Sequence, residues 1–176
     1  MNREINLKID LSRLSKEERD VFARLTEKAS RENCESRIWK PECGEWYWYI
    51  GSDGQINHCE WANDRIDRGR YSMGNCFRTK EEAEFAGEKQ KVKTELQRFA
   101  DEHNDLEKLG WNGVNGHHSI RYSYWTNDLV VSCMQQSKDI DCVYFTSTEI
   151  ADVAVKTVGE KRILKYLFDV DCEVDE

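Results

Sequence analysis

The feature that most constrains the fold is a pair of similar junctions, 68 residues apart, at which a strand passes into a helix. The stretch CFRTKEEAEFA begins at Cys76 and YFTSTEIADVA begins at Tyr144, and four of their eleven positions are identical. In each stretch a phenylalanine precedes a Thr or Ser that can cap a helix, and two alanines then fall on one helix face. This pattern predicts that one supersecondary unit occurs twice.

An aromatic hairpin is predicted before each junction. GEWYWYIGSDGQINHCEW, residues 44–61, alternates around an Asp-Gly turn, and HSIRYSYWTNDLVVSCM, residues 118–134, alternates around an Asn-Asp turn. We therefore expect an α+β fold of two repeated antiparallel hairpin-strand-helix (βββα) units, 37–108 and 109–176, preceded by an N-terminal strand and helix in 1–36. The two sheets either join into one or belong to units packed back to back.

Several helix boundaries can be predicted from capping residues. The N-terminal strand EINLKID is followed by a helix for which Ser15 and Glu18 form a capping box. Thr79 and Glu82 form the same pattern at the start of the long helix after the first hairpin. Gly159 is expected to break or kink the last helix.

The first hairpin has two different faces. Alternation places Trp46, Trp48 and Ile50 on one face, which we expect a helix to cover, and Tyr47 and Tyr49 on the uncovered face. Two neighbouring exposed tyrosines indicate a binding patch, or else an interface within the protein or an oligomer. Such a patch could stack on bases or anchor a protein partner.

The first unit carries about six more residues than the second between turn and junction, and this comparison predicts that NDRIDRGRY is the insertion. We expect it to form a loop or one irregular turn. Its mixed charges favour salt bridges within a solvated loop, although its arginines could contact a phosphate or a carboxylate. The candidate binding residues are Tyr47, Tyr49, Trp61, Asp64, Asp67, Arg68, Arg70, Tyr122 and Tyr124.

No pattern of catalytic or metal-binding residues stands out. The seven cysteines include no Cys-x-x-Cys pair, and GWNGVNG lacks the ending of a phosphate-binding loop. We therefore expect no catalytic residues, no metal and no cofactor, and a chain that is not an enzyme. An odd cysteine count and the lack of a signal-peptide pattern favour reduced thiols in the cytoplasm, and no apolar run is long enough to span a membrane.

The formal net charge of −8 is unevenly distributed. Residues 101–176 contain 15 acidic and 7 basic side chains, whereas the two types balance in the rest of the chain. An acidic surface repels nucleic-acid phosphates, but it could dock on a basic groove of a protein that handles nucleic acid. The alternative is that this charge only keeps the protein soluble.

Four stretches, IDLSRLSKEERDVF, WKPECGEWYWYIGSDG, GRYSMGNCFRTKEEAEFA and EKRILKYLF, resemble a family of small uncharacterised proteins encoded by phages and prophages of Gram-positive bacteria. The resemblance covers nearly the whole chain and implies an origin, without implying an activity. CFRTKEEAEFA also resembles the sheet-to-helix junction of three-stranded DNA-binding domains of the AP2 and integrase-arm type. This chain departs from them because its first unit is neutral and its second is acidic.

Origin, charge and the lack of a catalytic set together predict a non-enzymatic phage accessory protein in the bacterial cytoplasm. We expect it to bind a host protein and inhibit an antiphage defence system, such as a CRISPR effector. One alternative is sequestration of a nucleotide or small-molecule signal in a pocket between the units. The other is a nucleic-acid-binding regulator that uses Tyr47, Tyr49 and Arg70.

Overall fold

The computed structural model describes residues 15–16, 18–22 and 38–170. The chain divides into two compact units, Met1–Lys40 and Pro41–Glu176. Each unit is described by itself below.

In the first unit, the described residues cover the start of the predicted N-terminal helix. The capping box is confirmed: Ser15 Oγ accepts a hydrogen bond from the Glu18 amide at 3.2 Å, and the Glu18 carboxylate accepts one from the Ser15 amide at 2.8 Å. These hydrogen bonds lower the pKa of Glu18. The predicted strand EINLKID lies outside the described residues, as does the predicted helix beyond Phe22.

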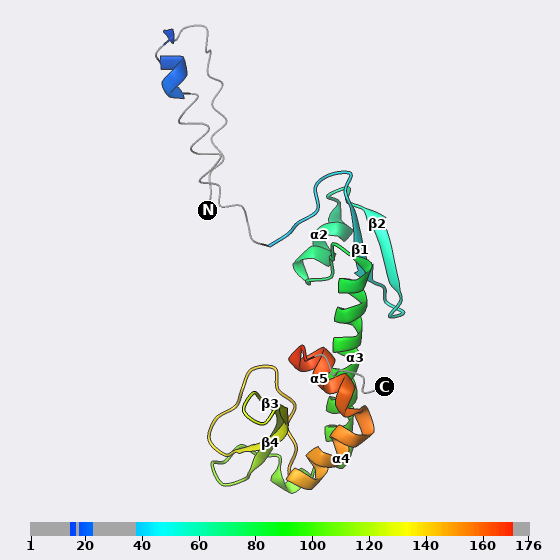
Figure 1. Cartoon of the computed structure of the whole chain (residues 1–176), viewed down its shortest axis with the longest axis vertical. Helices are drawn as coiled ribbons and strands as arrows, with labels where there is room; N and C mark the ends of the chain where they lie inside the picture. Colours follow the sequence, from blue (N-terminus) through cyan, green and yellow to red (C-terminus); the bar gives the residue numbers. More distant parts are fainter. Residues whose placement is uncertain (1–14, 17, 23–37, 171–176) are drawn as a thin grey trace. The chain divides into compact units, whose positions relative to one another are not determined.

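The second unit contains two separate antiparallel two-stranded sheets, together with helices (Figure 1). The α+β class and both predicted hairpins are therefore confirmed. The elements are β1 (Trp46–Ile50), β2 (Ile56–Glu60), α2 (Arg65–Ser72), α3 (Lys80–His103), the 3-10 turn η2 (Leu106–Lys108), β3 (His117–Ser123), β4 (Asp128–Met134), α4 (Thr148–Val158) and α5 (Glu160–Phe168).

Each predicted junction pairs with the hairpin that precedes it. Phe77 and Trp48 exchange two backbone hydrogen bonds, both of 2.9 Å, in an isolated antiparallel bridge. Phe145 and His118 form the equivalent bridge, with hydrogen bonds of 2.7 and 2.8 Å. A single bridging residue therefore stands where a third strand was expected.

The predicted helix boundaries agree with the structure. Thr79 Oγ1 accepts a hydrogen bond from the Glu82 amide at 3.2 Å at the start of α3, and Ser147 Oγ accepts one from the Ile150 amide at 3.3 Å at the start of α4. Both side chains satisfy amides that have no partner within the helix. Gly159 separates α4 from α5 with a φ of 101°, a conformation that favours glycine.

The hydrophobic core of the second unit lies where the later turns of α3 meet α4, α5 and one face of the β3–β4 hairpin. The predicted segments 37–108 and 109–176 share this core, since α3 comes from one and α4 and α5 from the other. Its buried residues are Val92, Leu96, Ala100, Val143, Phe145, Ala151, Ala154, Val158 and Ile163.

The first hairpin differs from its prediction. Tyr47, expected on an open face, is fully buried, while Trp46, expected in the core, is 58% exposed. The reason is that NDRIDRGRY, predicted as a loop, contains the helix α2, whose Asp67 and Arg70 contact the Tyr47 hydroxyl. On the opposite face Trp48 is half-buried, and Ile50 lies against Gly87 of α3.

Candidate protein-binding surface

Five of the predicted binding residues, Tyr47, Tyr49, Trp61, Asp67 and Arg70, meet in the contact between the first hairpin and α2, where they are buried or half-buried. The Tyr47 hydroxyl donates a hydrogen bond to Asp67 Oδ1 at 2.7 Å and accepts one from Arg70 Nη1 at 3.0 Å. The same nitrogen lies 3.2 Å from Cys59 Sγ, and the Arg70 guanidinium lies 3.5 Å from the centre of the Tyr49 ring. The proposed exposure of Tyr47 is therefore wrong, because a buried polar network encloses its hydroxyl.

Trp61 and Asp64 also contribute to packing and helix capping. Trp61 is 2% exposed and packs edge-on against Tyr47, so its prediction as a surface residue is wrong. Asp64 is the N-cap of α2 and forms a capping box with Asp67. Arg68 is exposed, and its Nε donates to the Asp64 carbonyl at 3.1 Å. The predicted salt-bridged loop is thus a capped helix.

The network holds its groups in fixed protonation states. Burial acts to raise the pKa of Asp67, but hydrogen bonds from the Tyr47 hydroxyl and the Ala62 and Asp64 amides outweigh it, so the pKa is lowered. Burial is also the main reason that the pKa of Tyr47 is raised. At neutral pH the carboxylate stays charged and the phenol stays protonated. This arrangement stabilises the packing of α2 on the hairpin.

The tip of the second hairpin presents aromatic rings to the outside. Trp125 is 94% exposed and Tyr124 is 81% exposed. Tyr124 packs edge-on against the half-buried Tyr122, with ring centroids 4.9 Å apart. Tyr122 and Tyr124 were predicted as binding residues. Trp125 was not, although its position two residues before the predicted Asn127-Asp128 turn was a usable signal.

The turn that carries these rings is held by several hydrogen bonds. The Asn127 amide donates to the Ser123 carbonyl at 2.8 Å, and the Thr126 amide donates to Ser123 Oγ at 3.3 Å. Asn127 has a φ of 54°, which asparagine tolerates better than most residues. The backbone that supports Trp125 is therefore organised before any partner arrives.

A groove of about 310 Å³ lies beside this tip, between the hairpin and α4. Its floor is mainly aliphatic, and its acidic residues are Asp128, Asp152 and Glu160, with Lys156 as the basic one. The aliphatic lining residues are Ile120, Leu129, Val130, Val131 and Val155. A groove with this lining suits an apolar segment that also carries positive charge.

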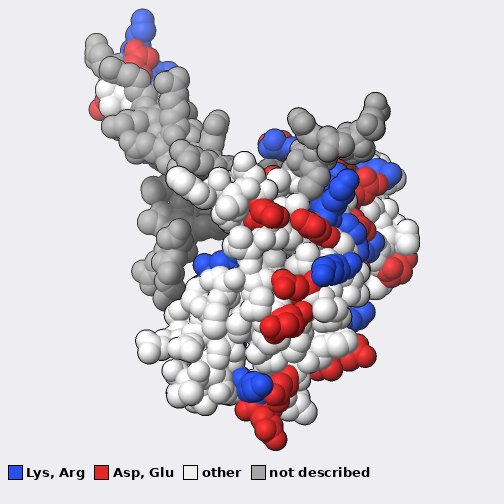
Figure 2. Space-filling view, turned by 60° about the horizontal axis from the view of Figure 1, so that its bottom comes forward, with Lys and Arg blue, Asp and Glu red and all other residues white. Residues whose placement is uncertain are grey.

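The surroundings of the groove are acidic as well. Residues 101–170, all of them described, contain eleven acidic and seven basic side chains. Figure 2 brings forward the end of the second unit that carries β3, β4 and α4, and shows acidic groups, with basic groups among them, beside a broad uncharged area. We define the binding surface as Tyr124, Trp125 and the groove with Asp128, Asp152 and Glu160.

Other kinds of site find less support in the part of the chain that the structure describes. That part contains no group of three His, Cys, Asp or Glu side chains that could hold a metal ion. It also lacks a helix long and apolar enough to cross a membrane. Five cysteines within it, Cys43, Cys59, Cys76, Cys133 and Cys142, are free thiols.

Comparisons with protein-family models, with curated proteins and with solved structures found no match. The resemblance to phage and prophage proteins therefore stays a prediction. The functional assignment depends on the geometry of the surface itself.

Proposed function

We propose that this chain is a non-enzymatic protein-binding module that docks the Tyr124–Trp125 tip and the adjoining acidic groove onto a basic segment of a partner protein. The observation that carries the proposal is the 94% exposure of Trp125 on an ordered turn beside that groove. Tryptophan and tyrosine are the side chains most enriched among residues that dominate binding energy.

The energetics divide between the two parts of the surface. A tryptophan that fills a partner's pocket typically contributes about 2 kcal/mol or more to binding, which corresponds to about a 30-fold change in affinity. The carboxylates around the groove add less affinity but speed association and select a basic partner, with strong salt dependence. Trp125 would therefore set the strength of binding, and Asp128, Asp152 and Glu160 the choice of partner.

In its narrower form, the proposal makes the chain a phage accessory protein in the bacterial cytoplasm that inhibits an antiphage defence effector, such as a CRISPR effector. Two features support this form. The acidic side chains of residues 101–170 match the positive charge of a nucleic-acid channel, and the aromatic tip offers an anchor within the same region. The nucleic-acid regulator is disfavoured because Tyr47 is buried and cannot stack on a base.

We also propose that the two hairpin–junction–helix units arose as repeats. The support is the equivalent bridging of Phe77 and Phe145, together with the equivalent caps Thr79 and Ser147. In this interpretation the repeat within 109–176 presents its hairpin tip. The repeat within 37–108 uses its additional helix, α2, to cover its own tyrosines.

The binding proposal can be tested by affinity capture from a bacterial lysate, with Trp125→Ala and Trp46→Ala as a matched pair. Both tryptophans are exposed and lie on hairpins, but only Trp125 belongs to the binding surface. We expect Trp125→Ala to lose a captured basic protein that wild type and Trp46→Ala both retain. Once that protein is purified, its affinity for the Trp125→Ala variant should be about 30-fold lower than its affinity for wild type. The affinity for wild type should decrease as the salt concentration rises.

The proposal fails if the Trp125→Ala variant binds its captured protein as tightly as wild type does. It also fails if Trp46→Ala weakens binding equally, or if the molecule retained through this surface is a nucleic acid.

A further inference from the structure

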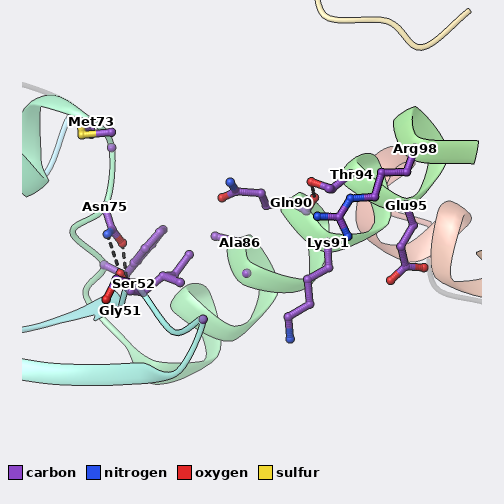
Figure 3. Close-up of a pocket in the computed structure, with 15 residues that line it drawn as sticks. Gly51, Ser52, Met73, Asn75, Ala86, Gln90, Lys91, Thr94, Glu95 and Arg98 are labelled. Atoms are coloured by element: carbon purple, nitrogen blue, oxygen red, sulfur yellow. Dashed lines mark hydrogen bonds between the residues drawn. The ribbon is translucent and has the colours of Figure 1, made fainter. Parts of the chain in front are cut away.

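A second hollow lies away from the binding surface, where three segments converge. The β1–β2 turn, the loop that follows α2 and the middle of α3 enclose a cavity of about 620 Å³ (Figure 3). Clefts of a few hundred to about 1,000 Å³ are typical of small-molecule sites. All three segments belong to the second unit, and α3 forms its longest wall.

One end of the cavity is apolar and offers few hydrogen-bonding groups. Ile50, Phe77, Ala86 and Gly87 form this part of its lining. Asn75, although polar, uses its side chain to bond both the amide and the carbonyl of Ile50, at 2.8 Å each. This end therefore suits a flat apolar group.

The other end is formed by polar side chains of α3, Gln90, Lys91, Thr94 and Arg98. In Figure 3 the Arg98 side chain runs back along α3 toward Gln90, while the Glu95 carboxylate points elsewhere. Within the described part of the chain, Arg98 forms no hydrogen bond or ion pair. An exposed guanidinium of this kind can bind a phosphate through two parallel hydrogen bonds.

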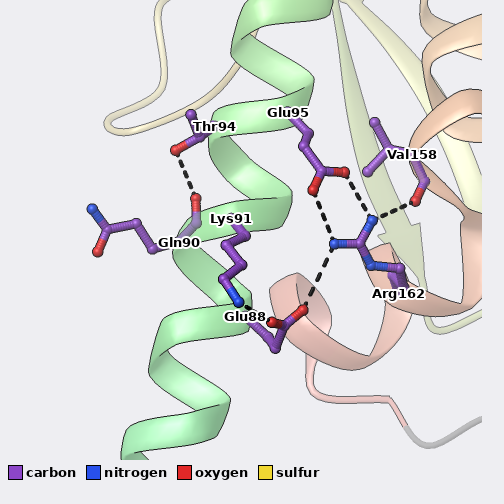
Figure 4. Close-up of polar contacts among 7 residues, drawn as sticks. All are labelled: Glu88, Gln90, Lys91, Thr94, Glu95, Val158 and Arg162. Atoms are coloured by element: carbon purple, nitrogen blue, oxygen red, sulfur yellow. Dashed lines mark hydrogen bonds and ion pairs between the residues drawn. The ribbon is translucent and has the colours of Figure 1, made fainter. Parts of the chain in front are cut away.

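The carboxylate of Glu95, which also lines the cavity, and that of Glu88 are each paired with other cations. Glu95 accepts two hydrogen bonds from Arg162 on α5, at 2.8 and 3.1 Å, and this pairing lowers the pKa of Glu95 (Figure 4). Glu88 bonds Lys91 Nζ at 2.6 Å and lies 3.7 Å from Arg162. Arg98 adds to the lowering of the pKa of Glu95 but makes no direct ion pair with it. A ligand phosphate would therefore not have to displace a bonded carboxylate from the guanidinium.

We propose that this cavity binds a small planar ligand carrying a phosphate group, of about the size of a nucleotide. The flat group would lie over Phe77 and Ile50, and the phosphate would contact Arg98, with Gln90 as an additional donor. The site is distinct from the Tyr124–Trp125 surface, so it neither requires nor excludes the binding of a protein partner there.

The test uses the full-length chain and adenosine 5′-monophosphate as the probe, measured by titration calorimetry. Adenosine and inorganic phosphate serve as the two half-ligands. We expect saturable binding of the probe, and binding of adenosine about tenfold weaker or more, because the neutral ligand loses the charge-assisted contact. Arg98→Ala should weaken the probe's binding by about tenfold to 100-fold.

The control is Lys89→Ala. Lys89 is an exposed cation on α3 but does not line the cavity, so this variant should bind the probe within about twofold of wild type. Three results would each overturn the proposal: no saturable binding of the probe, equal affinity for adenosine and its monophosphate, or equal weakening by Lys89→Ala and Arg98→Ala. Arg98 is exposed, so its removal does not threaten the fold.

Discussion

Replacing Tyr47 by phenylalanine removes a single oxygen atom from the contact between the first hairpin and α2. That hydroxyl donates to the buried Asp67 carboxylate at 2.7 Å and accepts from Arg70 at 3.0 Å. Hydrogen bonds to charged groups contribute about 1.5–3 kcal/mol to stability, and an unpartnered buried oxygen adds a penalty. We therefore expect Tyr47→Phe to lower the free energy of unfolding by about 2–3 kcal/mol.

The change should be visible in thermal unfolding followed by circular dichroism. For a unit the size of Pro41–Glu176, an entropy of unfolding of about 2.1 cal/mol/K per residue converts this loss into a fall in Tm of about 7–10 °C. Tyr122→Phe is the matched control, because its hydroxyl makes only an exposed 3.4 Å contact with Asn127. That variant should stay within about 0.5 kcal/mol of wild type.

The pH dependence provides a second check. The pKa of Asp67 is lowered in the folded state, so its contribution to stability is present above the pKa of an unfolded aspartate, about 3.9, and is lost as pH falls through the folded value. The difference between wild type and Tyr47→Phe should accordingly shrink in acid. A Tyr47→Phe variant as stable as the Tyr122→Phe control at neutral pH would refute the assigned network.

Two further predictions concern α3 and the caps. Gly87→Ala should stabilise the protein by up to about 1 kcal/mol, because alanine is the better helix former. The added Cβ would lie 3.8 and 3.9 Å from the side chains of Ile56 and Ile50, at ordinary contact distance. A lower midpoint of unfolding in urea would contradict this expectation. Thr79→Ala and Ser147→Ala should each cost about 1 kcal/mol by the same assay, and a clear effect at only one of them would argue against equivalent junctions.

Local signals in the sequence were sufficient to predict the hairpins and most helix ends. Turns and helix caps depend on interactions between residues close together in the sequence, so they can be predicted from short stretches. The examples here are the Asp53-Gly54 turn and the Ser15, Thr79 and Ser147 caps. Gly159 is similar, because its positive φ is a property of one residue. The α+β class follows from these local elements.

The faces of the first hairpin could not be predicted in the same way. Alternation separates Tyr47 from Trp46 but does not say which face is covered, and here the cover is α2, a short helix with few apolar residues. The Asp64–Asp67 capping box was the available signal for that helix. The exposure of Trp125 depends likewise on what the rest of the chain leaves uncovered.

The rings around Tyr47, which pack against α2, and the core around Phe145, to which α3 contributes, are separate buried clusters. Regions with separate packing can open independently, each with its own free energy. In deuterium exchange, the amides of β1 and β2 should therefore lose protection before those of the last turns of α3. The β1–β2 hairpin can thus loosen while the β3–β4 hairpin, with its aromatic tip, keeps its form.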